Sequence, residues 1–349
     1  MIQEKQKLSG TLNSKQSLNG TLSNSVIYVD PITQEKTVIP TAEQQIVTPD
    51  EKYTGLSKVT VEAIQDENLI SENIKNGVDI LGVTGNYVGS KYAPRYIRFY
   101  AYQGTDLDYE TANLDTSNIT GMNEMFRDCT KLTHLDLSNF DTSKVTNMHQ
   151  MFYNCPQLTT LNLSGFDTSN VTTMYSMFYS CQSLTTLDLS SFNTSNVTDM
   201  SYMFNNCISL TTLKLTNFDT SKVTSFYQTF YRCNKIVSIP KLNASVSTNV
   251  SFFAYDCKSL TDFGGLENLG QAYKTTSSAN YYSYKLDLST CTALTEQSLI
   301  NVLTNLYDIA TKGCKPQQVI LGSTNLAKLV SEEGQQALAS STEKGWSIS

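Results

Sequence analysis

The middle of the chain repeats one pattern of apolar and polar positions with a period of 26 residues. Residues 184–207, LTTLDLSSFNTSNVTDMSYMFNNC, are nearly a copy of residues 158–181, LTTLNLSGFDTSNVTTMYSMFYSC. A fixed period of this length predicts that one supersecondary unit is stacked several times. The interval relates four sets of apolar residues: Cys129, Cys155, Cys181, Cys207 and Cys233, with Cys257 following after 24; Leu135, Leu161, Leu187 and Leu213; Phe140, Phe166, Phe192 and Phe218; and Val145, Val171, Val197 and Val223.

Each unit begins with L-x-x-L-x-L, which predicts a short β-strand. In LTTLDL, Leu187 and Leu189 alternate with Asp188, so the leucines enter a core and their neighbours face outward. The second half predicts an amphipathic α-helix, because its apolar residues cluster on one face at about 100 degrees per residue. The polar stretch between them, NTSN or DTSK, supplies side chains that cap a helix start. In this unit the predicted helix face holds Val197, Met200, Met203, Phe204 and Cys207.

The predicted fold class is therefore an α/β solenoid, a leucine-rich-repeat stack of 26-residue strand–helix units, with a small, mainly β N-terminal region. A lone unit cannot bury its leucines, because each large apolar side chain contributes about 1.5–3 kcal/mol only when neighbouring units cover it. Stacking then gives one continuous hydrophobic column with a stiff exterior.

The cysteines are expected inside this column as a structural ladder of free thiols. Disulfides between neighbours and metal sites are the weaker alternatives, since the sequence has neither C-x-x-C nor a nearby pair of histidines. The predicted ladder comprises Cys129, Cys155, Cys181, Cys207, Cys233 and Cys257.

The repeated phrase carries a family resemblance. Sequences of the form FDTSNVTxMxxMFxxCxxLxxLxL recur from residue 114 to about residue 266, and this region resembles the bacterial BspA-like leucine-rich repeat family. The pattern weakens after Cys233. The segment from residue 286 onward predicts the order strand, helix, strand, helix, strand, and it resembles the divergent end unit that closes such a stack. The resemblance implies a surface protein that adheres to host proteins, cells or glycans, and it does not imply an enzyme.

The region before the repeats has a different character. KQKLSGTL and KQSLNGTL, near the N-terminus, predict a small hairpin or an arm that adds strands to a partner. The following residues predict short strands punctuated by Pro40 and Pro49 and a short helix that ends at Gly77. The phrases TPDEKYTGLSKVTV and NIKNGVDILGVTG resemble a small module of tail, baseplate and fibre proteins of phages that infect Firmicutes.

These patterns divide the chain into five regions. They are an N-terminal β arm or attachment segment at 1–30, a small α/β virion-type module at 31–90, a connector with an N-terminal cap strand at 91–113, the leucine-rich repeats at 114–285, and a C-terminal capping unit at 286–349.

Charge and composition disfavour several classes of partner and location. The net charge is −7 and the 25 basic residues form no patch or run, which disfavours nucleic acid and anionic membranes. The start of the chain lacks an apolar segment after its charges, and no run of about 18 apolar residues follows, so we expect neither an exported precursor nor a membrane protein. A bacterial adhesin would normally carry an export signal and an anchor, whereas a virion protein assembles in the bacterial cytoplasm and needs neither.

Two surfaces of the predicted stack are candidates for binding. Strand positions on the concave sheet offer hydroxyl, carboxylate and amide groups that suit sugars or a polar protein surface, although such a face can also be merely soluble. Tyrosines on the outer helix face, flanked by Tyr175 and Tyr227, offer a second, convex surface. The concave candidates are His134, Asp136, Ser138, Thr160, Asn162, Ser164, Thr186, Asp188, Ser190, Thr212, Lys214 and Thr216, and the convex candidates are Tyr153, Tyr179, Tyr202 and Tyr231.

Catalytic chemistry is poorly represented. The two histidines, His134 and His149, fall on a predicted strand and a predicted helix flank, with no serine or cysteine nucleophile placed by a known motif. Asp136 and Asp188 could lie near each other across two repeats, but acids in such ladders are more often solvated than paired for glycoside hydrolysis. The chain has no Walker loop, H-E-x-x-H, EF-hand loop or G-x-G-x-x-G, so we expect no catalytic residue, no metal and no cofactor.

The function expected is a non-enzymatic phage virion protein of the tail, baseplate or fibre, whose repeats contact a protein or glycan on the host surface. Residues 1–90 would bind other virion proteins. A bacterial cell-surface adhesin is the first alternative, and a structural decoration protein without a receptor is the second. The oligomeric state stays open, with a homo-oligomer among the options.

Overall fold

The computed structural model describes residues 114–274 and 285–349, together with Phe99, Tyr102, Gly104 and six short strands nearer the N-terminus. β2 (Gln45–Val47), β3 (Val59–Val61), β4 (Asp79–Ile80) and β5 (Val83–Thr84) form an antiparallel sheet in the order β2-β3-β5-β4, and β1 (Tyr28–Val29) pairs antiparallel with β6 (Ile97–Arg98). The predicted short helix that ends at Gly77, most of the N-terminal arm and most of the 91–113 connector lie outside the described residues.

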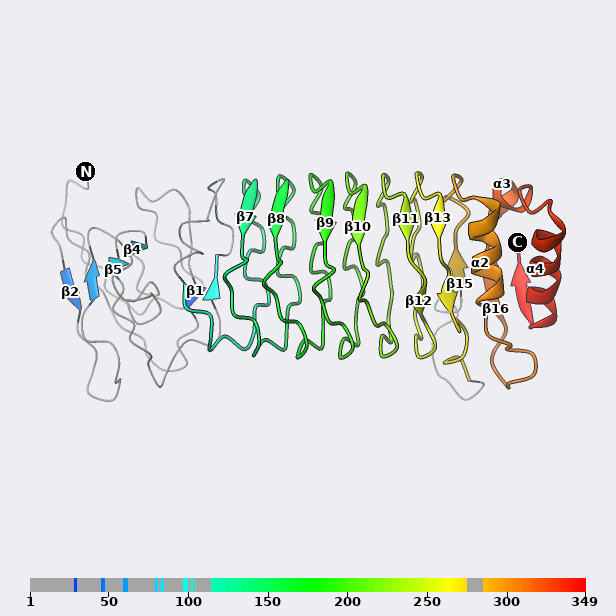
Figure 1. Cartoon of the computed structure of the whole chain (residues 1–349), viewed down its shortest axis with the longest axis horizontal. Helices are drawn as coiled ribbons and strands as arrows, with labels where there is room; N and C mark the ends of the chain where they lie inside the picture. Colours follow the sequence, from blue (N-terminus) through cyan, green and yellow to red (C-terminus); the bar gives the residue numbers. More distant parts are fainter. Residues whose placement is uncertain are drawn as a thin grey trace, which may run out of the picture.

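The repeats form a solenoid whose coils lie side by side along one long axis (Figure 1). Each of the first coils contributes one three-residue strand, and the strands are parallel in the pairs β7–β8 and β9–β10. Leu135 pairs with Leu161 and Leu187 with Leu213, so the predicted leucine alignment is confirmed within each of these two pairs. These strands are β7 (His134–Asp136), β8 (Thr160–Asn162), β9 (Thr186–Asp188) and β10 (Thr212–Lys214).

Later coils keep the same arrangement with shorter strands. β11 (Ser238–Ile239) pairs parallel with β13 (Asp262–Phe263), and β12 (Leu242–Asn243) pairs parallel with β14 (Leu266–Glu267). Single parallel bridges join coils on another side of the stack: Gly121↔Asn147, Asn147↔Thr173, Thr173↔Asp199, Asp199↔Ser225 and Ser225↔Asn249. Coil therefore follows coil in register even where the sequence pattern weakens.

The predicted helix in the second half of each unit is wrong: the structure has no α-helix between residues 114 and 274. These segments are consecutive turns. The backbone N–H of Gln150 donates to the carbonyl of Tyr175 on the next coil (2.8 Å), whereas the N–H of Met151 donates to Met148 three residues earlier (3.3 Å). Bonds to the neighbouring coil replace the i→i−4 bonds of a helix.

Left-handed backbone at two positions per unit prevents a helix from forming. Counted back from the ladder cysteine, positions −5 and −1 have positive φ, as at Gln150 (56°) and Asn154 (57°), and a left-handed residue interrupts a right-handed helix. The other such residues are Glu124, Asp128, Ser176, Ser180, Tyr202, Asn206, Gln228, Arg232, Phe252 and Asp256. The inward positions are nevertheless those predicted: Val197, Met200, Met203, Phe204 and Cys207 are all buried.

The polar stretch between strand and turns closes a corner instead of capping a helix. Asp167 accepts the backbone N–H of Ser169 in an Asx turn (2.9 Å). The hydroxyl of buried Thr168 donates to the carbonyl of Asn193 on the next coil (2.9 Å) and accepts that residue's N–H (2.8 Å). Threonine in this phrase thus joins two coils.

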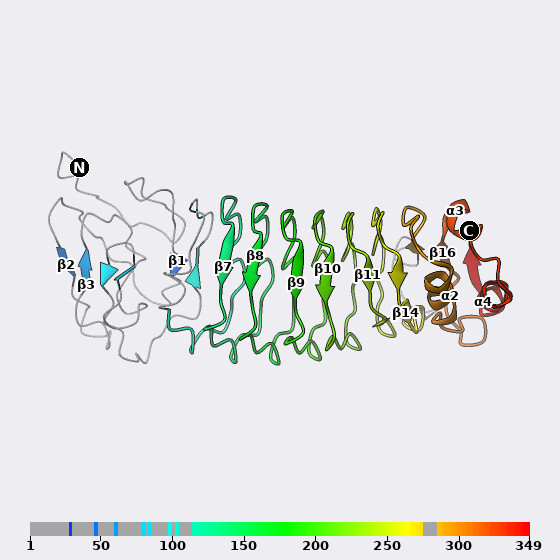
Figure 2. The same ribbon diagram turned by 45° about the horizontal axis from the view of Figure 1, so that its top comes forward.

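The stack is close to straight, so the expected concave and convex faces do not exist as such (Figures 1 and 2). Curvature in strand–helix solenoids arises because a helix is wider than a strand, and here both halves of a coil are one backbone thick. We call the side that carries β7–β10 the strand face. The turn face is the side formed by the consecutive turns that end at the ladder cysteines.

The core is a single continuous column, as predicted. Phenylalanine rings stack through it with centroids 5.2–5.6 Å apart and nearly parallel planes. Phe99, fully buried, is the first ring of the stack among the described residues, and its N–H donates to the carbonyl of Met125 in the first coil (2.6 Å). The stacked rings are Phe99, Phe126, Phe152, Phe178, Phe204 and Phe230.

The C-terminal segment closes the column with helices. The predicted order of strand, helix, strand, helix and strand is present, with one further short helix, α3 (Gly322–Leu326). α2 (Glu296–Thr304) and α4 (Glu332–Glu343) begin at Thr295 and Ser331, whose side chains cap them by accepting the N–H groups of Ser298 and Gly334. The parallel sheet β15-β16-β17 comprises β15 (Lys285–Asp287), β16 (Gln317–Ile320) and β17 (Trp346–Ile348).

Candidate interaction surfaces

The strand face carries the predicted concave candidates, and the fold itself uses several of their polar groups. Asp136, Asn162 and Asp188 each accept a backbone N–H two residues later, from Ser138 (2.9 Å), Ser164 (3.2 Å) and Ser190 (3.0 Å). Each of these side chains closes the turn that follows its strand. Their first role is therefore structural.

Asp188 is further committed to an ion pair. Its carboxylate lies 2.8 Å from the ammonium of Lys214 on the next coil and accepts the hydroxyl of Ser190 (2.6 Å). The bond from Lys214, followed by those from Ser190, lowers the pKa of Asp188 to about 2. Thr160, Thr186 and Thr212 remain exposed, with Thr186 in register with Thr212 and Thr160 in register with the half-buried His134. Thr216 and Ser164 are also exposed.

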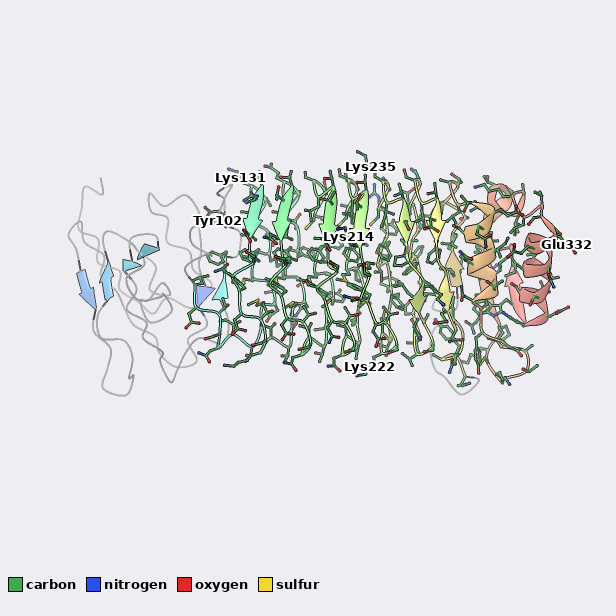
Figure 3. All side chains as sticks on the ribbon, in the orientation of Figure 1. Tyr102, Lys131, Lys214, Lys222, Lys235 and Glu332 are labelled. Atoms are coloured by element: carbon green, nitrogen blue, oxygen red, sulfur yellow. The ribbon has the colours of Figure 1, made fainter. Side chains whose placement is uncertain are left out.

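Charged side chains project over this part of the stack without gathering into one patch. Figure 3 shows Lys214 beside β10, with Lys131 and Lys235 at one edge of the stack and Lys222 at the other. The strand face is thus a mixed polar surface of hydroxyl groups and a few charges, such as Asp188 and Lys214, that are paired with each other.

The turn face carries the predicted convex tyrosines, and these belong to a larger set. Tyr153, Tyr179, Tyr202 and Tyr231 are all half-buried. Ring contacts join them to neighbours in a continuous row over successive coils. We call this row the aromatic band; it comprises Tyr153, Tyr175, Tyr179, Tyr202, Tyr227, Tyr231, Phe252 and Tyr255.

Two ring arrangements alternate along the band. Rings at position −2 stack on one another, as Tyr153 does on Tyr179 with centroids 4.6 Å apart and planes 8° apart. Rings at position −5 sit edge-on to the preceding coil: Tyr202 meets Tyr175 (5.5 Å) and Tyr179 (6.3 Å) in this way. The left-handed backbone at −5 accompanies this different direction (φ 59° at Tyr202).

Phe252 and Tyr255 were absent from the sequence prediction, although the sequence contains the signal for them. The last unit is shortened to 24 residues, and counting back from Cys257 places Phe252 at −5 and Tyr255 at −2. Phe252 repeats the position of Tyr202, meeting Tyr227 (6.5 Å) and Tyr231 (6.3 Å) edge-on. The band therefore extends one coil further than predicted.

Packing within the band raises the pKa of two of its phenols. Partial burial, and next the neighbouring Tyr227, raise the pKa of Tyr202 to about 12. Burial, and next Tyr179, also raise the pKa of Tyr153. Along its centre the band is an uncharged surface of rings, hydroxyls and amides, with Asn205 donating to Gln228 (2.9 Å) and Gln228 to the Tyr227 hydroxyl (3.1 Å).

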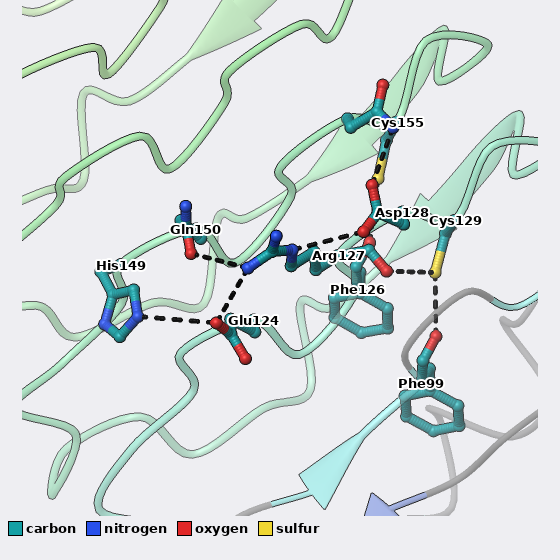
Figure 4. A network of polar contacts seen from close by, with 10 residues as sticks. Phe99, Glu124, Phe126, Arg127, Asp128, Cys129, His149, Gln150 and Cys155 are labelled. Carbon is teal, nitrogen blue, oxygen red and sulfur yellow. Dashed lines mark hydrogen bonds and ion pairs between the residues drawn. The ribbon is translucent and has the colours of Figure 1, made fainter. Parts of the chain in front are cut away.

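A polar network lies beside Tyr153, the first ring of the band among the described residues (Figure 4). Arg127 donates to Glu124 (3.0 Å), Asp128 (3.3 Å) and Gln150 (3.1 Å). Its guanidinium also lies 4.9 Å from the ring centroid of Tyr153, within the range of a cation–π contact. The first coil thus covers the outer ring of the band with charge.

The ladder cysteines are free and buried, and their thiols bond to the backbone. Cys155 donates to the carbonyl of Phe126 on the preceding coil (3.0 Å), and Cys129 donates to Phe99 (2.9 Å), as Figure 4 shows. Cys181, Cys207, Cys233 and Cys257 repeat the contact at 3.0–3.2 Å, and Cys291 extends it into the C-terminal unit. Burial raises the pKa of Cys207 to about 12, so its thiol stays protonated and able to donate.

The two histidines lie at different places in the first coils. His149 contacts Asn147 (Nδ1 to Oδ1, 3.0 Å) and lies 4.0 Å from Glu124, within the polar network, while His134 is on β7. In the described part of the chain, no cluster of three or more histidine, cysteine or acidic side chains is suited to a metal ion. Within the same residues, no helix has the length and apolar character needed to cross a bilayer.

Comparisons with known proteins bear on the repeat region. A family model described as "Mycoplasma protein of unknown function, DUF285" matches residues 98–162 and 157–263, which cover the stack of coils and just under half of the 349-residue chain. This match supports a BspA-like repeat protein, as the repeated phrase predicts. No curated protein matches the chain.

Among solved structures, the chain is similar to the functional domain of InlJ from Listeria monocytogenes, which is described as including a cysteine ladder. The two share 16% identity over 65% of this chain and 67% of that one, with a TM-score of 0.14. The solenoid fold follows from the parallel strand pairing between coils.

Proposed function

We propose that the repeat stack is a non-enzymatic binding rod whose aromatic band contacts a protein or glycan on the surface of a host cell. The band is the observation that carries this proposal. Tyrosine provides a large contact area and has few rotatable bonds to freeze, and it is enriched where proteins bind partners. The family match to the repeat region supports a role in protein interaction.

The finer proposal is that the chain belongs to a phage tail, baseplate or fibre, assembled in the bacterial cytoplasm and held to the particle through residues 1–90. Support comes from the phrases TPDEKYTGLSKVTV and NIKNGVDILGVTG, which resemble modules of such proteins. A bacterial cell-surface adhesin is the alternative that the repeat-family match favours.

Binding to cells tests the role of the band. We expect the labelled full-length chain to bind some strains of a Firmicutes panel, and the double substitution Tyr179→Ser with Tyr231→Ser to weaken that binding by about tenfold or more, since truncated anchor residues cost over 1 kcal/mol each. Thr186→Ala with Thr212→Ala on the strand face is the matched control and should bind normally. Loss of cell binding in the control alone would show that the strand face makes the contact. Absence of cell binding by the unmodified chain and by both variants would favour a decoration protein.

Particle composition tests the virion assignment separately. Mass spectrometry of purified phage particles from a lysed host that encodes the chain should detect it, and gold-labelled antibody should mark one end of the tail. Detection on intact uninfected cells instead would support the adhesin.

A further inference from the structure

Tyr153 and Tyr179 form an unusual pair within the aromatic band. Their ring centroids are 4.6 Å apart, closer than any other pair in the band, and their planes differ by only 8°. The backbone holds them in register, because the N–H of Asn154 donates to the carbonyl of Tyr179 (2.7 Å). Both residues are half-buried, so each is partly accessible to solvent.

The neighbours of the pair leave each ring with a single parallel partner. Arg127 covers the outer face of Tyr153. On the other side, Tyr202 approaches Tyr179 at 64°, with centroids 6.3 Å apart. Stacked rings in register bring the carbons beside their hydroxyl groups close together, whereas an edge-on ring directs its rim at the partner's face. Proximity of this kind favours reaction between the two groups held together.

The geometry points to Tyr153 and Tyr179 as a site of oxidative cross-linking, at which a one-electron oxidant such as a peroxidase with hydrogen peroxide joins adjacent coils through a dityrosine bond. The site is a modification site, and it is independent of what the band binds.

The reaction balances as follows in atoms and electrons. Each phenol gives one electron to the oxidant and one proton to water, which leaves two phenoxyl radicals. A carbon–carbon bond then forms between the ring carbons next to the two hydroxyl groups, and the hydrogens on those carbons move to the oxygens through water and restore both rings. Two protons and two electrons reduce one hydrogen peroxide to two waters.

Other phenols of the band lie close together without parallel stacking. Tyr202 lies 5.5 Å from Tyr175 and 5.0 Å from Tyr227, both edge-on, so a radical formed on any of these rings has a close phenol beside it. Tyr231 and Tyr255 are also parallel, but their centroids are 5.9 Å apart. If parallel stacking decides the product, Tyr153–Tyr179 is the main cross-link, Tyr231–Tyr255 a minor one, and Tyr202–Tyr227 is absent despite its short distance.

Peptide mapping after oxidation tests this order. The full-length chain, at low concentration and with Cys314→Ala to remove the one partly exposed thiol of the described residues, is treated with peroxidase and hydrogen peroxide. A protease that cleaves before aspartate releases residues 141–166, which contain Tyr153, and residues 167–187, which contain Tyr175 and Tyr179. We expect these peptides joined, at their summed mass less two hydrogens, in protein that remains monomeric on a denaturing gel.

Matched variants identify the partner. Tyr179→Phe should abolish the joined peptide and most of the dityrosine fluorescence, whereas Tyr175→Phe, in the same peptide, should leave both unchanged. The cross-linked monomer should also unfold at a higher temperature than untreated protein, because the bond closes a loop in the unfolded chain. Loss of the joined peptide in Tyr175→Phe, a dominant Tyr202–Tyr227 product, or cross-links found only between molecules would each overturn the assignment.

Discussion

At the scale of single residues, the ladder cysteines combine two properties that are usually separate. Each thiol fills a place in the apolar column, and each donates a hydrogen bond to a phenylalanine carbonyl on the preceding coil, as Cys181 does to Phe152 (3.2 Å). Most of these carbonyls also accept a backbone N–H, as Phe178 does from Cys181 (3.2 Å), but the Phe152 carbonyl accepts none from the described residues. A buried carbonyl without a donor costs free energy, so the Cys181 thiol satisfies an acceptor that an alanine would leave unpaired. The sequence predicted the burial from periodicity but could not predict the acceptor, because nothing in the pattern shows which carbonyls lack a partner.

Substitution of Cys181 separates the two properties. Cys181→Ala should lower the free energy of unfolding by about 1–3 kcal/mol, because it removes the donor and leaves a small void. Cys181→Ser keeps a donor of similar size and should cost less than alanine. The measurement is the urea midpoint followed by circular dichroism. A serine variant less stable than the alanine variant would show that the thiol acts as an apolar group and that the bond contributes little.

At the scale of elements, the comparison between sequence and structure centres on the second half of each unit. The apolar positions at −10, −7, −4, −3 and 0 fit one face of a helix, and the structure buries the same residues without one. A chain of turns that alternates bonds within a coil and bonds to the next coil brings the same positions inward. Amphipathic periodicity therefore predicted what is buried, and it could not distinguish the two backbones.

The candidate surfaces were predictable to a similar depth. Counting from the cysteine placed the tyrosines outside the core, and it would have included Phe252 and Tyr255 had the 24-residue spacing been followed. The alternation of stacked and edge-on rings accompanies a left-handed φ at position −5. Tyrosine and phenylalanine rarely adopt this conformation, so the residue types at −5 do not predict it. Straightness, and with it the loss of a concave face, follows from the missing helices.

Left-handed backbone at position −1 gives a direct test of the turn architecture. Asn206 has φ 62°, and its side chain donates to Ser180 (3.0 Å). Asn206→Val and Asn206→Gly both remove that bond, but valine also places a branched Cβ in the left-handed region. We expect valine to be less stable than glycine by about 1–2 kcal/mol in thermal or urea unfolding. Equal stability of the two variants would contradict the observed backbone at this position.

At the scale of the whole molecule, each coil contacts the coil before and the coil after, through the same ladders. Backbone bonds, buried threonine hydroxyls, thiols and stacked phenylalanines all join residues of adjacent coils. In such an array the stability is close to a sum of unit and neighbour terms, and closing units at the ends protect the column. Here the helical C-terminal unit lies at one end, and Phe99 is the first ring of the stack among the described residues.

Removal of one whole unit tests this modular construction. Deleting residues 167–192 removes one 26-residue unit and joins Phe166 to Asn193. Because Phe166 and Phe192 occupy equivalent positions, each remaining coil still places its apolar residues against equivalent residues of its neighbour. The shortened chain should fold and unfold cooperatively, with a somewhat lower midpoint, as circular dichroism and size-exclusion chromatography would show. Deleting residues 167–179 is the control, because it shifts the apolar positions out of phase and should give an aggregated product. Failure of both deletions alike would show that the coils are not interchangeable.

The bonds between coils, noted above at Gln150 and Tyr175, run along the long axis of the stack, and this has a mechanical consequence. Tension applied between the two ends of the stack loads the hydrogen bonds of one coil at a time, so they break in sequence. A force applied across the long axis would instead load the bonds of many coils together. Each 26-residue coil that peels away releases about 90 Å of slack chain. Under load the stack would therefore lengthen in equal steps and shorten again as coils refold onto it, which limits the peak force on its two ends.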